Sequence, residues 1–383
     1  MRHVGRLILV AAVIGAVAAA LPAEQVPDDR ADRLWRRWDR NRDGRLTREE
    51  LPEGVRRNFD RVDRDGDGAI SREEHRAVAA RRRPQADRRP PDVSRQWPNV
   101  EATRDVPYAG TDNPRQCLDL YLPKERKGNG PLPLVVFIHG GAWRAGDKRR
   151  GAGMVAPYVD TGRFAGASIG YRLSGEVVWP AQIHDCKAAV RWIKAHAGKY
   201  NLDPDRIAVW GSSAGGHLVA MLGATADVPD LEGNLGSHTD QTSRVACVVD
   251  WFGPSELLRM NDEPGGMDHL AAGSPESQLI GCPITENEDK ARAVSPVTYV
   301  SKGDSPHLIM HGDKDRTVPH DQSVRLAAAL EKAGVPCTFV TIKGAGHGGF
   351  RNPEVHKRIR LFLEKYLLGA DVTVSAEAIE NTP

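Results

Sequence analysis

The sequence predicts an α/β fold, a doubly wound and mostly parallel sheet covered by helices, with a small all-α domain in front of it. Three observations indicate this arrangement. Short apolar runs alternate with helical patterns from residue 97 onward, two matching acidic segments precede them, and a stretch rich in proline and arginine lies between. A chain of 383 residues, of which 27% are charged, can hold one large domain and a small one.

Six apolar runs within the large domain, expected over 97–370, suit the strands of a buried parallel sheet. They lie at 134–139, 164–173, 206–210, 244–252, 307–311 and 337–343. Helical patterns at 181–200 and 321–334 alternate with them. Ligands bind at the carboxyl ends of the strands in open sheets of this type, so we expect the functional motifs directly after these runs.

One motif follows the run at 206–210. The stretch GSSAG matches the pattern G-x-S-x-G, a sharp strand-to-helix turn that exposes a nucleophilic serine. Ser213 takes the serine position, with Gly211 and Gly215 as the two glycines. The neighbouring Ser212 fails the pattern, since a tryptophan and an alanine would replace the glycines. The sequence therefore predicts Ser213 as the nucleophile.

The same pattern occurs a second time, at 166–170, around Ser168. That serine lies inside a predicted strand with no helix after it, so a small core residue is the preferred interpretation.

A serine hydroxyl needs a base within hydrogen-bond reach, and the base needs a carboxylate to orient it. His347 lies in a glycine-rich loop after the last predicted strand and is the expected base. His356 belongs to a predicted closing helix and is expected on its surface. Two aspartates, Asp313 and Asp315, follow the run at 307–311 and are both candidates for the orienting acid.

Four motifs together carry a resemblance to a known family. They are HGGAW (139–143), GSSAG (211–215), HGDKDRTVP (311–319) and GAGHGGF (344–350). In this order they resemble the α/β-hydrolase serine esterases, near the hormone-sensitive-lipase-like, acetylxylan and feruloyl esterases, over 97–368.

The resemblance implies roles for single residues. The aspartate two positions before Val-Pro orients the base, which here is Asp315. The oxyanion hole is formed by main-chain N–H groups, here those of Gly141, Ala142 and Ala214. Trp143 either walls the substrate pocket or packs beneath the loop. The insert 253–306 is expected to cap the pocket.

The expected activity is that of a serine carboxylesterase acting on short acyl esters, without a catalytic cofactor. Acetyl or feruloyl groups on plant polysaccharide are the expected substrates. HGGAW departs from the triple-glycine form of the hormone-sensitive-lipase group and is similar to the HGGxW of kynurenine formamidases. A formamidase or amidase is therefore the alternative.

Two segments at 39–50 and 63–74 match the twelve-residue EF-hand calcium loop. Each has oxygen ligands at positions 1, 3 and 5, glycine at position 6, a carbonyl ligand at position 7 and glutamate at position 12. The ligands are Asp39, Asn41, Asp43, Arg45 and Glu50 in the first loop and Asp63, Asp65, Asp67, Ala69 and Glu74 in the second. Leu46 and Ile70, at position 8, are expected to meet in a short two-stranded bridge.

The EF-hand pair is expected over 28–82, with structural calcium as the preferred role. The two loops start 24 residues apart, at Asp39 and Asp63, which is similar to the spacing in dockerin modules. A docking or adhesion protein that depends on calcium is thus the alternative from another functional class.

The two ends of the chain, the linker and the overall composition bear on export and on binding partners. A basic start, an apolar run over 7–21 and small residues after it predict a cleaved signal peptide, 1–23, and a secreted or periplasmic protein. A retained membrane anchor is the alternative. The segments 83–96 and 371–383 are expected as linker and tail. The net charge of +2 argues against nucleic acid as a partner, and five scattered cysteines form no disulfide framework.

Overall fold

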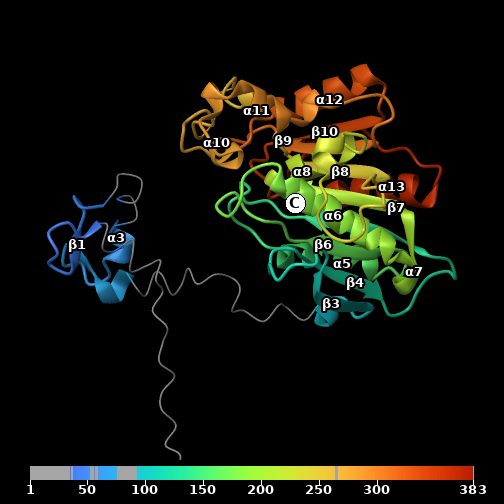
Figure 1. Cartoon of the computed structure of the whole chain (residues 1–383), viewed down its shortest axis with the longest axis horizontal. Coiled ribbons are helices and arrows are strands. Elements are labelled where there is room, and N and C mark those ends of the chain that lie inside the picture. The colour runs from blue at the N-terminus through green and yellow to red at the C-terminus, as the bar shows by residue number, and fades with distance from the viewer. Residues whose placement is uncertain are drawn as a thin grey trace, which may run out of the picture. The chain divides into compact units, whose positions relative to one another are not determined.

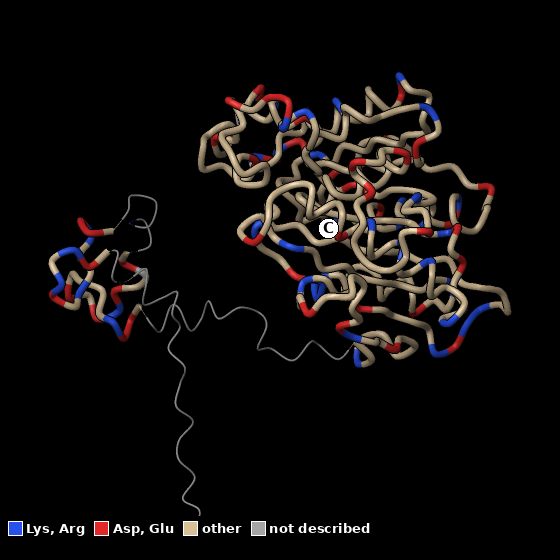
Figure 2. The backbone as a smooth tube through the Cα atoms, in the orientation of Figure 1, with Lys and Arg blue, Asp and Glu red and all other residues tan. Residues whose placement is uncertain are grey.

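The computed structural model describes residues 35, 38–51, 56, 59–75, 93–263 and 266–382. The chain divides into two compact units, Met1–Arg89 and Pro90–Pro383, each of which is described by itself (Figure 1). The predicted signal peptide and most of the linker lie outside the described residues. Acidic and basic residues are interspersed along both units, as Figure 2 shows.

The first unit is built around two short antiparallel strands, β1 (Arg45–Thr47) and β2 (Ala69–Ser71). Leu46 lies opposite Ile70 in their register, which confirms the predicted bridge. Helix α3 (Phe59–Val62) precedes the second loop. Among the described residues of this unit, the small core contains Trp35, Leu46, Leu51, Phe59 and Ile70. The paired loops thus contribute Leu46 and Ile70 to this core.

The second unit contains a nine-stranded sheet in the order β11-β10-β9-β8-β7-β5-β6-β4-β3. All neighbouring strands are parallel except the pairs β3–β4 and β4–β6. The strands are β3 (Val100–Pro107), β4 (Cys117–Pro123), β5 (Leu132–Ile138), β6 (Ala165–Ile169), β7 (Leu202–Ser212), β8 (Cys247–Trp251), β9 (His307–Gly312), β10 (Cys337–Lys343) and β11 (Ile379–Glu380).

Helices connect these strands. They are α5 (Ala152–Val159), α6 (Ala181–Ala195), α7 (Ala197–Tyr200), α8 (Ala214–Ala224), α9 (Pro229–Glu232), α10 (Pro275–Ile280), α11 (Glu288–Ala293), α12 (Asp321–Ala333) and α13 (Glu354–Leu368). Short 3₁₀ turns are η2 (Val93–Arg95), η3 (Lys148–Gly151), η4 (Leu257–Arg259), η5 (Ile284–Glu286) and η6 (Pro296–Thr298). The single helix predicted at 181–200 is divided into α6 and α7 at His196.

Successive side chains of a strand point to opposite faces of the sheet, and residues on both faces are buried here. In β5, all seven residues are buried. Leu134 and Val136 pack in one core with α6 and α8, whereas Val135 and Phe137 pack in a second core with α5 and α13. A continuous apolar run is what a central parallel strand requires.

Each of the six runs predicted as strands overlaps one, and these six strands are joined in parallel, which confirms the fold class. Strands β3, β4 and β11 were not predicted. The expected tail 371–383 contributes β11, which pairs with β10 through Ile379 and Glu380.

The insert 253–306 carries α10 and α11, which are both six residues long, and its apolar residues join the core around α6 and α8. All five cysteines have free thiols. Among the residues that the structure describes, no helix combines the length and apolarity needed to cross a bilayer.

Candidate active site

Ser213 lies at the sharp turn between β7 and α8. Its backbone angles are φ 56° and ψ −124°, a strained combination for a residue with a side chain. The two glycines of the motif are required sterically. A Cβ on Gly211 would lie 2.1 Å from the carbonyl oxygen of Gly215, and one on Gly215 would lie 2.1 Å from that of Ile138. The backbone thus packs too closely at both positions for any other residue.

The other two serines are placed differently. Ser212 is the last residue of β7. Ser168 is fully buried inside β6, and its hydroxyl donates to the carbonyl oxygen of Lys148 at 2.6 Å. Ser168 is therefore a core residue, and Ser213 alone lies at a strand-to-helix turn of the predicted kind.

Asp315 and His347 come together from two neighbouring loops. Asp315 follows β9, His347 follows β10, and the Nδ1–H of His347 donates to Oδ2 of Asp315 at 2.7 Å. The histidine side chain is 26% exposed, whereas the aspartate side chain is fully buried. Asp313 instead accepts from the backbone N–H of Gly344 at 2.7 Å, which fixes the loop after β10.

The carboxylate of Asp315 accepts four hydrogen bonds, two on each oxygen. Its Oδ1 accepts the backbone N–H groups of Thr317 at 2.8 Å and Val318 at 3.0 Å. Its Oδ2 accepts Nε2–H of His311 at 3.2 Å in addition to the bond from His347. Burial alone would raise the pKa of Asp315, but the hydrogen bonds from His311 and His347 outweigh it and hold the pKa well below its usual range. The aspartate is therefore ionised at neutral pH.

Ser213 and His347 are linked through the end of β8. The backbone N–H of Ser213 donates to the carbonyl oxygen of Trp251 at 2.8 Å. The next residue, Phe252, has φ 45°, and its ring centroid lies 4.6 Å from that of His347. Since β7, β8, β9 and β10 are neighbours, nucleophile, base and acid lie at one edge of the sheet. An imidazole that is held by a carboxylate at the same edge of the sheet as a hydroxyl on such a turn can activate that hydroxyl for attack on a carbonyl.

The HGGAW loop packs directly against the nucleophile. A Cβ on Gly140 would lie 3.2 Å from Cβ of Ser213. Gly141 has φ 128°, and its carbonyl oxygen accepts the N–H groups of Arg144 and Ala145 in a tight turn. Ala142 has φ 53°, a conformation that residues with a side chain rarely adopt. Ala214 is the first residue of α8, so its N–H has no acceptor within the helix. These are the N–H groups predicted for an oxyanion hole.

Trp143 is 1% exposed and belongs to the core. Its indole N–H donates to Nδ1 of His217 at 3.2 Å. Of the two roles left open by the sequence, packing beneath the loop describes its position, and we do not assign Trp143 to a pocket wall.

Sequence reasoning missed the partners of the predicted residues. The sequence alone assigned no role to His311, His217 or Phe252. Their roles depend on contacts between loops, and only the position of His311 just before Asp315 offered a local signal.

The first calcium loop has a carboxylate that fits a cation. Oδ2 of Asp39 accepts the N–H of Gly44 and Nε1–H of Trp35, both at 3.2 Å. Its Oδ1 is buried and has no hydrogen-bond partner among the residues that the structure describes. A buried carboxylate oxygen without a donor is costly unless a ligand satisfies it.

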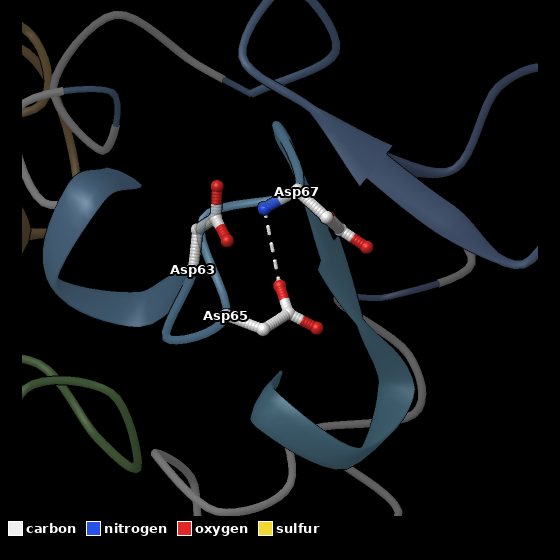
Figure 3. Close-up of side chains that lie close together, drawn as sticks. All are labelled: Asp63, Asp65 and Asp67. Carbon is white, nitrogen blue, oxygen red and sulfur yellow. Dashed lines mark hydrogen bonds between the residues drawn. The ribbon is translucent and has the colours of Figure 1, made fainter.

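In the second loop, Asp63, Asp65 and Asp67 each offer a carboxylate oxygen, and these oxygens lie within 4.8 Å of one another (Figure 3). The backbone N–H of Asp67 donates to Oδ1 of Asp65 at 3.2 Å, which stabilises the turn of the loop (Figure 3). Such a group of hard oxygen ligands fits calcium.

The glutamates at position 12 are held in the same way in both loops. Glu50 accepts the N–H of Thr47, and Glu74 accepts that of Ser71, at 2.9 and 2.8 Å. The backbone hydrogen bond from Ser71 is the main cause that lowers the pKa of Glu74 to about 2. Asn41 and Asp43 are hydrogen-bonded to each other within the first loop. Arg45 and Ala69, the predicted carbonyl ligands, are the first residues of β1 and β2.

The fold and this site define a serine hydrolase of the α/β-hydrolase class. The chain belongs to the BD-FAE family, whose model matches residues 118–330, and EF-hand models match 36–53 and 57–78.

Known proteins agree with this assignment. The chain is 29% identical to the esterase LipC of Mycobacterium tuberculosis over 301 residues, covering 72% of each chain. It is 37% identical to an arylesterase of Saccharolobus solfataricus, covering 64% of this chain and 76% of that one. A truncated carbohydrate esterase from gut microbiota is 38% identical with a TM-score of 0.65, covering 70% of this chain and 96% of that one. The protein is an esterase that carries an EF-hand pair.

Proposed function

We propose that the protein is a secreted serine carboxylesterase that hydrolyses short acyl esters. The observation that carries the proposal is the hydrogen bond between His347 and Asp315 beside the strained turn of Ser213. In the proposed reaction the hydroxyl of Ser213 attacks the ester carbonyl, and Nε2 of His347 takes its proton.

The negative charge that develops on the carbonyl oxygen is held by the N–H groups of Gly141, Ala142 and Ala214. His347 returns the proton to the leaving alcohol. Water then cleaves the acyl-enzyme with His347 again as the base.

Short acyl groups are favoured because the cap offers little apolar lining. A long acyl chain needs a continuous apolar channel, which gains about 0.8 kcal/mol per buried CH₂. The large apolar residues of the cap, such as Leu257, Leu279 and Ile284, are buried in the core. Within the described part of the cap, only Met267 is a large exposed hydrophobic residue.

Acylated polysaccharide is the proposed natural substrate. One structural neighbour is a carbohydrate esterase, and another is a bifunctional GH43-CE protein of Bacteroides eggerthii, 35% identical with a TM-score of 0.63. The predicted signal peptide 1–23 supports a polymer outside the cell as the target.

We further propose that the EF-hand pair holds structural calcium. Its ligands would be Asp39, Asn41, Asp43, Glu50 and the carbonyl oxygen of Arg45 in loop 1, and the equivalent residues in loop 2. The ion would join the ends of each loop and stabilise the small unit. The orphan oxygen of Asp39 supports this role.

The test is kcat/KM for p-nitrophenyl acetate, butyrate and octanoate, followed by acetyl release from acetylated xylan. We expect the acetate to be preferred and xylan to be deacetylated. A rate that rises toward octanoate would contradict the short-acyl proposal. Activity on a formamide with none on xylan would instead assign the formamidase alternative.

A further inference from the structure

His217 occupies the junction of three parts of the site. It lies in the first turn of α8, where its backbone N–H donates to the carbonyl oxygen of Ser213 at 3.0 Å. Its side chain is fully buried. On one side it contacts the HGGAW loop through Trp143, and on the other it contacts the cap through Val294.

The two hydrogen bonds of the ring fix its state. The indole N–H of Trp143 can only donate, so Nδ1 of His217 accepts it, at 3.2 Å. The carbonyl oxygen of Val294 can only accept, so Nε2–H donates to it, at 2.6 Å. His217 is thus the neutral Nε2–H tautomer with both nitrogens used. Burial, which lowers its pKa to about 4, keeps it neutral.

The HGGAW loop needs such an anchor. Ala142 and Trp143 are consecutive residues with φ of 53° and 54°, in the left-handed region that side chains disfavour. Strained residues of this kind persist only where the surrounding structure holds them. The Trp143 ring meets the His217 ring edge to face, with centroids 5.2 Å apart, and donates its N–H to it. The loop is therefore fastened to the same helix turn that carries Ser213.

We propose that His217 is the positioning residue of the oxyanion hole. By holding Trp143 it fixes the direction of the Ala142 N–H relative to Ser213, and by holding Val294 it ties this geometry to the cap. The inference rests on the proposed function, because it assumes that the loop N–H groups stabilise the oxyanion. His217 touches no substrate in this role.

Two variants test the contact from both sides. Trp143→Phe keeps an aromatic ring and removes only the N–H, and His217→Leu removes both ring nitrogens. We expect each to lower kcat by about tenfold or more with KM little changed, because an oxyanion donor acts in the transition state. The double variant should be no slower than the slower single variant, because both substitutions break one contact.

A boronic acid inhibitor supplies the second measurement. It mimics the tetrahedral intermediate, so its affinity should fall in parallel with kcat/KM, whereas the affinity for the product carboxylate should not change. His307→Leu is the matched control. His307 is equally buried, bonds the carbonyl oxygen of Ser305 and packs near Gly223 at the far end of α8. It should lower thermal stability while leaving kcat per active site unchanged.

All rates are normalised to the sites titrated by a fluorophosphonate. A wild-type protein whose Ser213 is not labelled would overturn the proposed function itself. If the wild type is labelled and Trp143→Phe keeps full kcat and boronate affinity, His217 is only a packing residue and the inference is wrong. Effects of the two variants that simply add would also overturn it.

Discussion

The catalytic region and the first calcium loop both depend on aspartates, but their carboxylates are satisfied in opposite ways. Asp315 receives four hydrogen bonds, two on each oxygen, all from its own chain. Asp39 is also buried, yet one of its oxygens has no donor. A fully satisfied carboxylate is ionised and fixed, which suits the orientation of a base. A carboxylate with an orphan oxygen instead needs either a ligand from outside the chain or a proton.

Asp250 is a buried aspartate at which protonation is favoured. It is fully buried in β8, where Oδ1 accepts the N–H of Gly253 and Oδ2 has no partner. Burial raises the pKa of Asp250 to about 7. The same type of side chain is thus held ionised where four donors surround it, as at Asp315, and is shifted towards its neutral form where burial dominates, as at Asp250.

The largest expected effect follows from removing the nucleophile of the catalytic region. Ser213→Ala should lower kcat by roughly 10⁴-fold or more, because nucleophile, base and acid act as a unit. Its neighbour Ser212 provides the matched control, and Ser212→Ala should keep most of the activity. Kinetics with p-nitrophenyl acetate check both variants. A dead Ser212→Ala protein with a live Ser213→Ala protein would reverse the assignment.

The next prediction concerns Asp250 and pH. A carboxyl whose folded pKa is raised loses its proton more readily when unfolded, so the stability it supports falls as pH rises from about 4 to about 7, by at most about 1.4 kcal/mol per pH unit. Asp250→Asn cannot ionise, so its stability should depend less on pH across this window. Urea unfolding at pH 5 and pH 8 measures the difference.

Asp119 is the control for this effect. It is equally buried but pairs with Arg104 at 2.8 Å and with Lys148 at 3.4 Å. Asp119→Asn removes the buried negative charge that both cations contact and should destabilise the protein at both pH values. Equal pH profiles for wild type and Asp250→Asn would show that Asp250 is ionised in the folded protein.

Removal of calcium tests the proposed role of the EF-hand loops. At about 1 mM calcium and a Kd of about 0.1 mM, each site would add about 1.4 kcal/mol to the stability of the small unit. We expect a chelator to lower the melting transition of this unit while kcat for a small soluble ester stays nearly unchanged. The predicted ligands and the catalytic residues belong to different compact units. Loss of ester turnover on chelation would contradict this separation.

Local patterns were enough to predict six of the parallel strands and the strand-to-helix turn at Ser213, because these depend on neighbours in sequence. Long apolar runs and glycine-framed motifs are of this kind. Strand β3 escaped prediction because most of its residues alternate between half-buried and exposed, and β11 because it has only two residues.

The contacts that position the site could not be predicted in the same way. Trp143 and His217 are 74 residues apart, and His217 and Val294 are 77 apart. No local pattern distinguishes such a histidine from an ordinary core residue. The orphan oxygen of Asp39 likewise appears only once the loop is folded.

The smallest expected effect sharpens the comparison within the EF-hand pair. Oδ1 of Asp67 accepts the N–H of Ala69 at 3.0 Å, which leaves Oδ2 as the oxygen for a cation. The guanidinium of Arg45, from the first loop, pairs with that Oδ2. Calcium bound at Oδ2 of Asp67 would therefore have to displace the Arg45 guanidinium or share this oxygen with it. Arg45→Gln should lower the Kd of one of the two sites by about two- to fivefold, as expected for an exposed ion pair, and less at high salt.

Arg48 supplies the control for this last prediction, because it also joins the two hands by an ion pair. Its partner is Asp60, which precedes the second loop and is not a ligand position. Calorimetric titration of the full chain with calcium should show an unchanged Kd for Arg48→Gln. If both variants change the Kd equally, the effect is one of net charge near the loops. If Arg45→Gln leaves the Kd unchanged, the guanidinium does not compete with calcium for Asp67.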